Sequence, residues 1–116
     1  MVKKLDTWRV NQPNNMPAEQ KLENVVIAYA RERGILTYKF VSPANRGVPD
    51  RVFLFPSGIT LWIEFKAPGR KPTPLQARTM LKMVQQKCLV AVVDNSLAAY
   101  DIIDKLLEKK MVISDK

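Results

Sequence analysis

Histidine is absent from this chain of 116 residues, and cysteine occurs once, at Cys88. Without histidine there is neither a Ser-His-Asp triad nor a histidine-ligated zinc site, and a single cysteine builds no zinc finger. With only four glycines and no Gly-x-x-x-x-Gly-Lys pattern, a phosphate-binding nucleotide loop is disfavoured. No apolar run approaches the roughly 20 residues that span a bilayer, so we expect a cytoplasmic protein. Chemistry is left to carboxylates, lysines, hydroxyls and a recruited metal.

Positive charge is in excess, because 19 Lys and Arg against 11 Asp and Glu give a net charge of +8. In a domain this small, such an excess favours a polyanionic partner, most often a nucleic acid. A basic protein whose charge serves only solubility is the alternative. Hydrophobic residues at 47% and charged residues at 26% are typical of a globular protein, and the length predicts one domain.

The hydrophobic pattern predicts an α/β domain in the order α-β-β-β-α-β-α, with a mixed central sheet flanked by helices. Residues 1–16 are expected to form an irregular N-terminal arm, which carries Trp8, and residues 17–116 the domain itself. Pro17 suits the first turn of the first helix and Gly34 the position just past its end. The expected elements are helices at about 17–33, 73–87 and 96–109, and strands at about 35–41, 51–55, 59–66 and 89–93.

Burial can be predicted from the same patterns. In the first helix Glu19 lies nearer the apolar stripe than Glu23 does, so Glu19 is expected to face inward. The apolar run 89–93 is consistent with a strand covered on both faces. In the middle helix four apolar residues are expected to face the core: Leu75, Met80, Leu81 and Val84.

A pair of carboxylates stands out where two expected strands meet. Asp50 opens one strand, and the alternation of residues 60–66 places Glu64 and Lys66 on the same face of the next. If these strands pair as a hairpin through the turn at 56–58, both carboxylates and the ammonium converge at one end. Close carboxylates raise each other's pKa unless a cation lies between them. This arrangement suits a divalent ion and phosphodiester hydrolysis, whereas an ion pair at a strand end is the alternative without chemistry.

Three segments and one helical residue carry a family resemblance: residues 47–51 (GVPDR), 63–68 (IEFKAP) and 72–76 (PTPLQ), preceded by Glu19. In this order they resemble the VRR-NUC family of the PD-(D/E)xK nuclease superfamily, whose small stand-alone members are typically encoded by phages. The resemblance extends from about Glu19 to Asp94 and implies a restriction-endonuclease-like core. Glu23 is the rival of Glu19 for the glutamate of the first helix.

The resemblance implies a role for each matching residue. Asp50 and Glu64 would bind Mg²⁺, or Mn²⁺ in its place, with the backbone carbonyl of Phe65. Lys66 would orient or deprotonate the attacking water, and Glu19 would support the metal site. Gln76 would position Lys66 or a phosphate, although a capping box with Thr73 is an equally good explanation.

The expected activity is that of a metal-dependent endonuclease that cleaves DNA without reading its bases. By resemblance, the protein would act as a homodimer on branched DNA such as Holliday junctions, in the host cytoplasm if a phage encodes it. A non-catalytic nucleic-acid-binding module is the alternative. Four basic residues near the acidic pair are expected to hold the DNA backbone: Arg46, Arg51, Arg70 and Lys71.

Overall fold

A four-stranded sheet in the order β1-β2-β3-β4 forms the centre of the molecule. The computed structural model describes residues 15–109, so the predicted N-terminal arm, Trp8 included, lies almost wholly outside the described residues. The helices are α2 (Ala18–Glu32), α3 (Pro74–Gln85) and α4 (Ser96–Glu108). The strands are β1 (Leu36–Lys39), β2 (Arg51–Leu54), β3 (Thr60–Phe65) and β4 (Leu89–Val93). The predicted order and the mixed sheet are confirmed.

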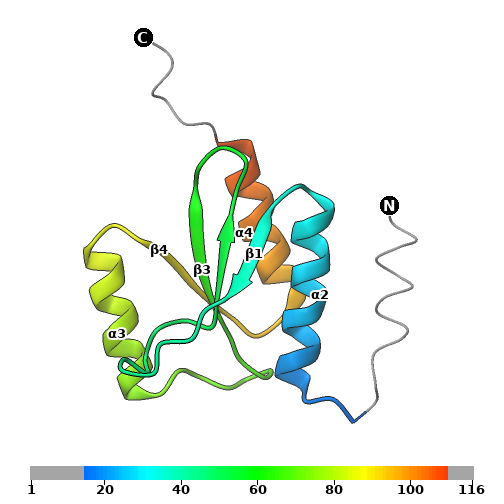
Figure 1. Ribbon diagram of the computed structural model, residues 1–116. Coiled ribbons are helices and arrows are strands. Elements are labelled where there is room, and N and C mark those ends of the chain that lie inside the picture. Colours follow the sequence, from blue (N-terminus) through cyan, green and yellow to red (C-terminus); the bar gives the residue numbers. More distant parts are fainter. Residues whose placement is uncertain (1–14, 110–116) are drawn as a thin grey trace.

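The sheet combines an antiparallel meander with one parallel pair. β1 pairs antiparallel with β2, and β2 pairs antiparallel with β3 through the turn at 55–59. β3 and β4 are parallel, because α3 carries the chain back between them. In Figure 1, α2 and α4 lie together on one side of the strands, and α3 lies on the other.

The core lies between the sheet and the pair α2 and α4. Alternate residues of the strands point towards these two helices, as the period of a β-strand requires. Tyr29 of α2 stacks on Tyr100 of α4 at a ring-centroid distance of 3.9 Å, which joins the two helices at their outer edge. The core residues include Val26, Ala30, Phe53, Leu61, Ile63, Phe65, Val93, Ala99 and Ile103.

Local sequence signals set the helix ends. Gly34 follows α2 with a φ of +78°, and the chain turns there into β1. Thr73 caps α3 and Pro74 begins it, and a complete capping box with Gln76 is present. Asn95 caps α4 by accepting a hydrogen bond from the Ala98 N–H.

The sheet face that carries α3 is much less covered than the core face, and two burial predictions are wrong. Of the four apolar residues predicted to face the core from α3, only Met80 is buried, because α3 packs along β4 alone and does not reach across the sheet. The second concerns the edge strand β4, which is exposed on both faces: Leu89, beside Leu61 on the core face, is 44% exposed, and Val92, on the α3 face, is 42% exposed. In the described part of the chain, no helix combines the length and apolarity needed to cross a bilayer.

Candidate active site

Asp50 and Glu64 lie side by side at one end of the β2–β3 hairpin. The register pairs Arg51 with Ile63, so its extension by one residue places Asp50 opposite Glu64. The backbone N–H of Phe65 donates a hydrogen bond to the Asp50 carboxylate, which ties this side chain to the end of β3. The Asp50 carbonyl accepts a hydrogen bond from the Phe40 N–H at 2.7 Å, so β1 also holds this position. The convergence predicted from the sequence is present.

The loop that leads into Asp50 is anchored by a close approach to α3. A Cβ atom added at Gly47 would lie 2.6 Å from the Thr79 Cβ and 2.8 Å from the Leu75 carbonyl oxygen. Glycine is therefore needed for contact and not for an unusual backbone angle. Pro49 is fully buried, which fixes the chain immediately before Asp50. The loop thus links α3 to the position of the carboxylate.

Glu64 is the most enclosed acidic group of the site, with 2% of the residue exposed. One carboxylate oxygen, Oε2, accepts a hydrogen bond from Gln76 Nε2 at 3.1 Å and lies 3.3 Å from Lys66 Nζ. The other oxygen, Oε1, is buried and has no hydrogen-bond partner within residues 15–109. A buried carboxylate oxygen without a donor is costly, and a bound cation removes that cost.

The pKa values of both carboxyl groups are raised. Burial is the main cause for Glu64, and the neighbouring charge of Asp50 adds to it, while Lys66 acts in the opposite direction. Burial also raises the pKa of Asp50, followed by the charge of Glu23, against the lowering effect of Lys39 and Lys66. Two carboxylates that resist ionisation side by side form a site that favours a positive ion.

The donor set fits a hard divalent ion. Among the described residues, no three His, Cys, Asp or Glu side chains gather closely enough to hold a metal. A metal would therefore be bound by the carboxylates of Asp50 and Glu64 together with a main-chain oxygen. The backbone carbonyl of Phe65 is the candidate for that third ligand. Oxygen donors of this kind suit Mg²⁺ or Mn²⁺ and not a soft metal.

Gln76 takes part in two contacts: the capping box expected from the sequence is present, and the side chain also reaches Glu64, while its expected role in positioning Lys66 or a phosphate stays a prediction. Its Oε1 accepts a hydrogen bond from the Thr73 N–H at 3.0 Å and completes the capping box of α3. Its Nε2 donates to Glu64. The start of α3 is thereby attached to the carboxylate pair.

The prediction that Glu19 faces inward in preference to Glu23 is wrong. Glu23 is 3% exposed, whereas Glu19 is only partly buried. Glu23 can enter the interior because its Oε2 lies 2.8 Å from Arg51 Nε and 3.9 Å from Lys39 Nζ. Both glutamates act on the site, since the charge of Glu23 raises the pKa of Asp50 and that of Glu19 raises the pKa of Glu64.

Arg51 is misassigned as a DNA-backbone contact. Its side chain is 11% exposed and points to the α2 side of the sheet, where it binds Glu23 and donates to the Thr37 hydroxyl. The reason is strand alternation, because the residue after Asp50 must face the opposite way. The other three basic residues predicted to hold DNA are exposed: Arg46, Arg70 and Lys71.

Arg70 and Lys71 lie on a loop whose position is fixed near the site. The Gly69 N–H donates to the Asp94 carboxylate at 3.0 Å, which ties this loop to the residue after β4. That hydrogen bond is the main reason why the pKa of Asp94 is lowered. One basic residue was missed by sequence analysis, namely Lys39, whose charge acts on Asp50. Its place at the end of the strand paired with β2 was the available signal.

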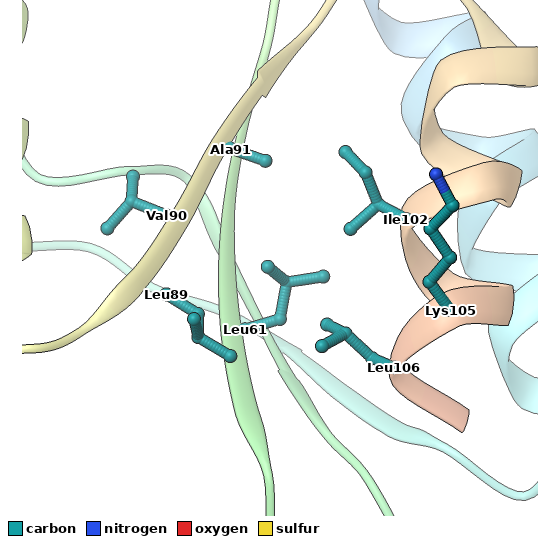
Figure 2. Close-up of a pocket in the computed structure, with 7 residues that line it drawn as sticks. All are labelled: Leu61, Leu89, Val90, Ala91, Ile102, Lys105 and Leu106. Carbon is teal, nitrogen blue, oxygen red and sulfur yellow. The ribbon is translucent and has the colours of Figure 1, made fainter. Parts of the chain in front are cut away.

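An apolar pocket lies away from the carboxylate pair. An apolar hollow of about 270 Å³ opens between β4, β3 and the end of α4, lined by Leu61, Leu89, Val90, Ala91, Ile102, Lys105 and Leu106 (Figure 2). It contains no carboxylate and lacks the groups that could act on a phosphodiester. The candidate site is the carboxylate pair and not this hollow.

The fold is that of a known small domain. A solved structure described as "VRR_NUC domain" superposes with a TM-score of 0.68 at 24% identity, and the match covers 83% of this chain and 100% of that one. No protein-family model matches the chain.

A curated relative is considerably more similar in sequence. "Putative nuclease p44" of Acyrthosiphon pisum secondary endosymbiont phage 1 is 42% identical over 77 residues, which are 66% of this chain and 83% of that protein. With the shared fold, this places the chain in a family: it belongs to the VRR-NUC family.

Removal of the charge of Glu64 should stabilise the metal-free protein at neutral pH. Because its folded-state pKa is raised, ionised Glu64 costs stability above that pKa, and the cost disappears as pH falls towards the ordinary value of 4.5. In chelator at pH 7, Glu64→Gln should raise Tm on the order of 4 °C, the shift expected for about 1 kcal/mol. Calorimetry should show this difference from wild type narrowing as pH is lowered. A lower Tm for the variant at pH 7 would contradict the argument.

Substitution of the two glutamates of α2 should affect the free energy of unfolding by very different amounts. Glu23→Ala leaves the buried Arg51 without its partner and should cost about 3 kcal/mol or more. Glu19→Ala, at a partly exposed position, should change the free energy of unfolding by about 0.5 kcal/mol or less. Urea unfolding of both variants measures the difference. Equal effects would show that the Glu23–Arg51 pair is not a structural contact of this importance.

Proposed function

We propose that this member of the VRR-NUC family is a nuclease that hydrolyses phosphodiester bonds in DNA with the help of Mg²⁺, or of Mn²⁺ in its place. The observation that carries the proposal is the enclosed Glu64, which has one oxygen held by Lys66 and Gln76 and the other without a donor. The similarity of the fold to a VRR_NUC domain and the phage relative named as a nuclease support the proposal independently of the site geometry.

Each group of the site has a role in this proposal. Asp50 and Glu64, with the Phe65 carbonyl, would hold the divalent ion, which supplies positive charge for the phosphate and lowers the pKa of water when bound. Lys66 is 14% exposed at its side chain, so its ammonium is partly screened from solvent and can orient a water or stabilise developing negative charge. Gln76 keeps Glu64 in place, and Glu19 adds negative charge nearby.

DNA as the substrate is supported by charge. The net charge of +8 and the exposed Arg46, Arg70 and Lys71 around the site provide contacts for phosphates on either side of the scissile bond. Contacts of this type give affinity without sequence choice. We further propose a branched substrate such as a Holliday junction, a homodimer whose two sites cut two strands, and action in the cytoplasm of the host cell.

Lys66→Ala should abolish turnover while DNA binding remains. Loss of a positioned acid–base or electrostatic group should lower the cleavage rate by about a hundredfold or more. Labelled four-way junction is incubated with wild type, Lys66→Ala and the control Lys82→Ala, which removes an exposed lysine of α3. Wild type and the control should cut with Mg²⁺ or Mn²⁺ and stop in chelator.

Three results would contradict the proposal. These are an uncut substrate with wild type, cleavage that continues in chelator, and equal rates for wild type and Lys66→Ala. Salt-sensitive binding with no metal-dependent turnover would establish a binding module instead. A linear duplex cut as fast as the junction would remove the branched-DNA part alone.

Gln76→Ala and Thr73→Ala should separate the two roles of the glutamine. Both break the capping box, so each should cost about 1 kcal/mol in unfolding. Only Gln76→Ala also removes the donor to Glu64, and its cleavage rate should fall by roughly tenfold or more, the scale of one lost hydrogen bond to a charged group. If the rates of both variants fall equally, the contact with Glu64 has no part in cleavage.

A further inference from the structure

Next to the carboxylate pair, aromatic side chains line the open face of the sheet. By the strand register, one row across this face is Tyr38, Val52, Trp62 and Val90. The adjoining row, extended one residue past β1 and β2, is Phe40, Asp50, Glu64 and Val92. Tyr38 and Phe40 therefore lie on β1 and directly after it, on the same face as the two carboxylates, within one strand of Asp50.

These rings are exposed to solvent, whereas many residues on the opposite face of the same sheet are buried in the core. Tyr38 is 55% and Phe40 39% exposed, while the half-buried Trp62 meets Phe40 edge-on at a ring-centroid distance of 5.1 Å. Exposed apolar surface that is continuous on a sheet face usually marks a binding site. Tyr38 is part of β1, and Phe40, directly after β1, is held by its hydrogen bond to Asp50 and by its contact with Trp62.

We propose that Tyr38 and Phe40, backed by Trp62, form a stacking surface for an unpaired DNA base beside the scissile phosphate. This inference rests on the proposed nuclease function and specifies its substrate as DNA with unpaired bases at the cut. Aromatic rings accept any base through its flat face, so stacking gives affinity without reading sequence. Bases inside a duplex are already stacked and paired, and cannot offer that face without being extruded.

The position of the rings favours DNA over a protein partner. They lie in the row of Asp50 and in the row next to it, so a second copy of the chain or a terminal segment seated there would cover the carboxylates. A substrate strand must reach those carboxylates in any case. Lys39, between the two rings in sequence, belongs to the other side of the sheet, where its Nζ lies 3.9 Å from Glu23 Oε2, so the ring surface itself is apolar.

Stacking is tested by binding in chelator, where no cleavage occurs. The probes are a duplex with a short single-stranded gap that contains the fluorescent base 2-aminopurine and the same sequence fully paired. Wild type should bind the gapped DNA more tightly and change the fluorescence of the unpaired base. Tyr38→Leu and Phe40→Leu, which keep an apolar side chain, should each weaken gapped binding by about tenfold and leave duplex binding unchanged.

Two control variants separate the ring from the surface it occupies. Tyr38→Phe keeps the ring and should bind as wild type. Leu36→Ala alters a side chain 57% exposed on the same strand and face, two residues further from the carboxylates, and should also bind as wild type. Equal affinity of Tyr38→Leu and wild type for gapped DNA would overturn the inference, as would an equal loss for gapped and paired DNA.

Two further measurements complete the test. Sedimentation that shows wild type as a dimer and Tyr38→Leu as a monomer would identify the rings as a subunit interface and overturn the stacking role. Cleavage is measured separately with Mg²⁺. Preferred binding of gapped DNA by wild type, lost in Tyr38→Leu, together with no cleavage by either, would retain the stacking surface and refute the nuclease.

Discussion

The site depends on two carboxylates of like charge that are held together in a partly buried position. Antiparallel pairing of β2 with β3 sets Asp50 opposite Glu64, and burial is the main cause of the raised pKa of both groups. Repulsion by Asp50 adds to the shift of Glu64, and repulsion by Glu23 adds to the shift of Asp50. The hydrogen bonds around them, from the Phe65 N–H and from Gln76, hold the pair against that repulsion. Unfavourable charge of this kind lowers the stability of a folded protein and would be offset by a bound cation.

The two faces of the sheet differ in how far they are covered. On the face towards α2 and α4, alternate residues are buried, and the buried charge of Glu23 is paired there with Arg51. The opposite face is covered along β4 by α3 and is exposed at Tyr38 and Phe40, and it also carries the enclosed carboxylate of Glu64.

Several features could be predicted from the sequence because they depend on residues that are close together along the chain. The capping box of α3, the end of α2 at Gly34 and the hairpin that joins Asp50 to Glu64 all follow from local patterns. Burial was less predictable. Glu23 is inside because Arg51, 28 residues away, supplies a counter-charge, which no helical period reveals. The exposure of Val92 follows from the edge position of β4, a property of strand order and not of composition.

The sequence by itself therefore determined the class of fold, the order of its elements and the convergence of Asp50 and Glu64 at one end of a hairpin. Alternation, caps and turns act over a few residues, and the acidic pair belongs to one hairpin. Only the tertiary structure decided which glutamate of α2 is buried, that Arg51 is an internal partner, and that Gln76 reaches Glu64 while capping its helix. Those outcomes depend on which charges meet across separate elements, and that is set by packing.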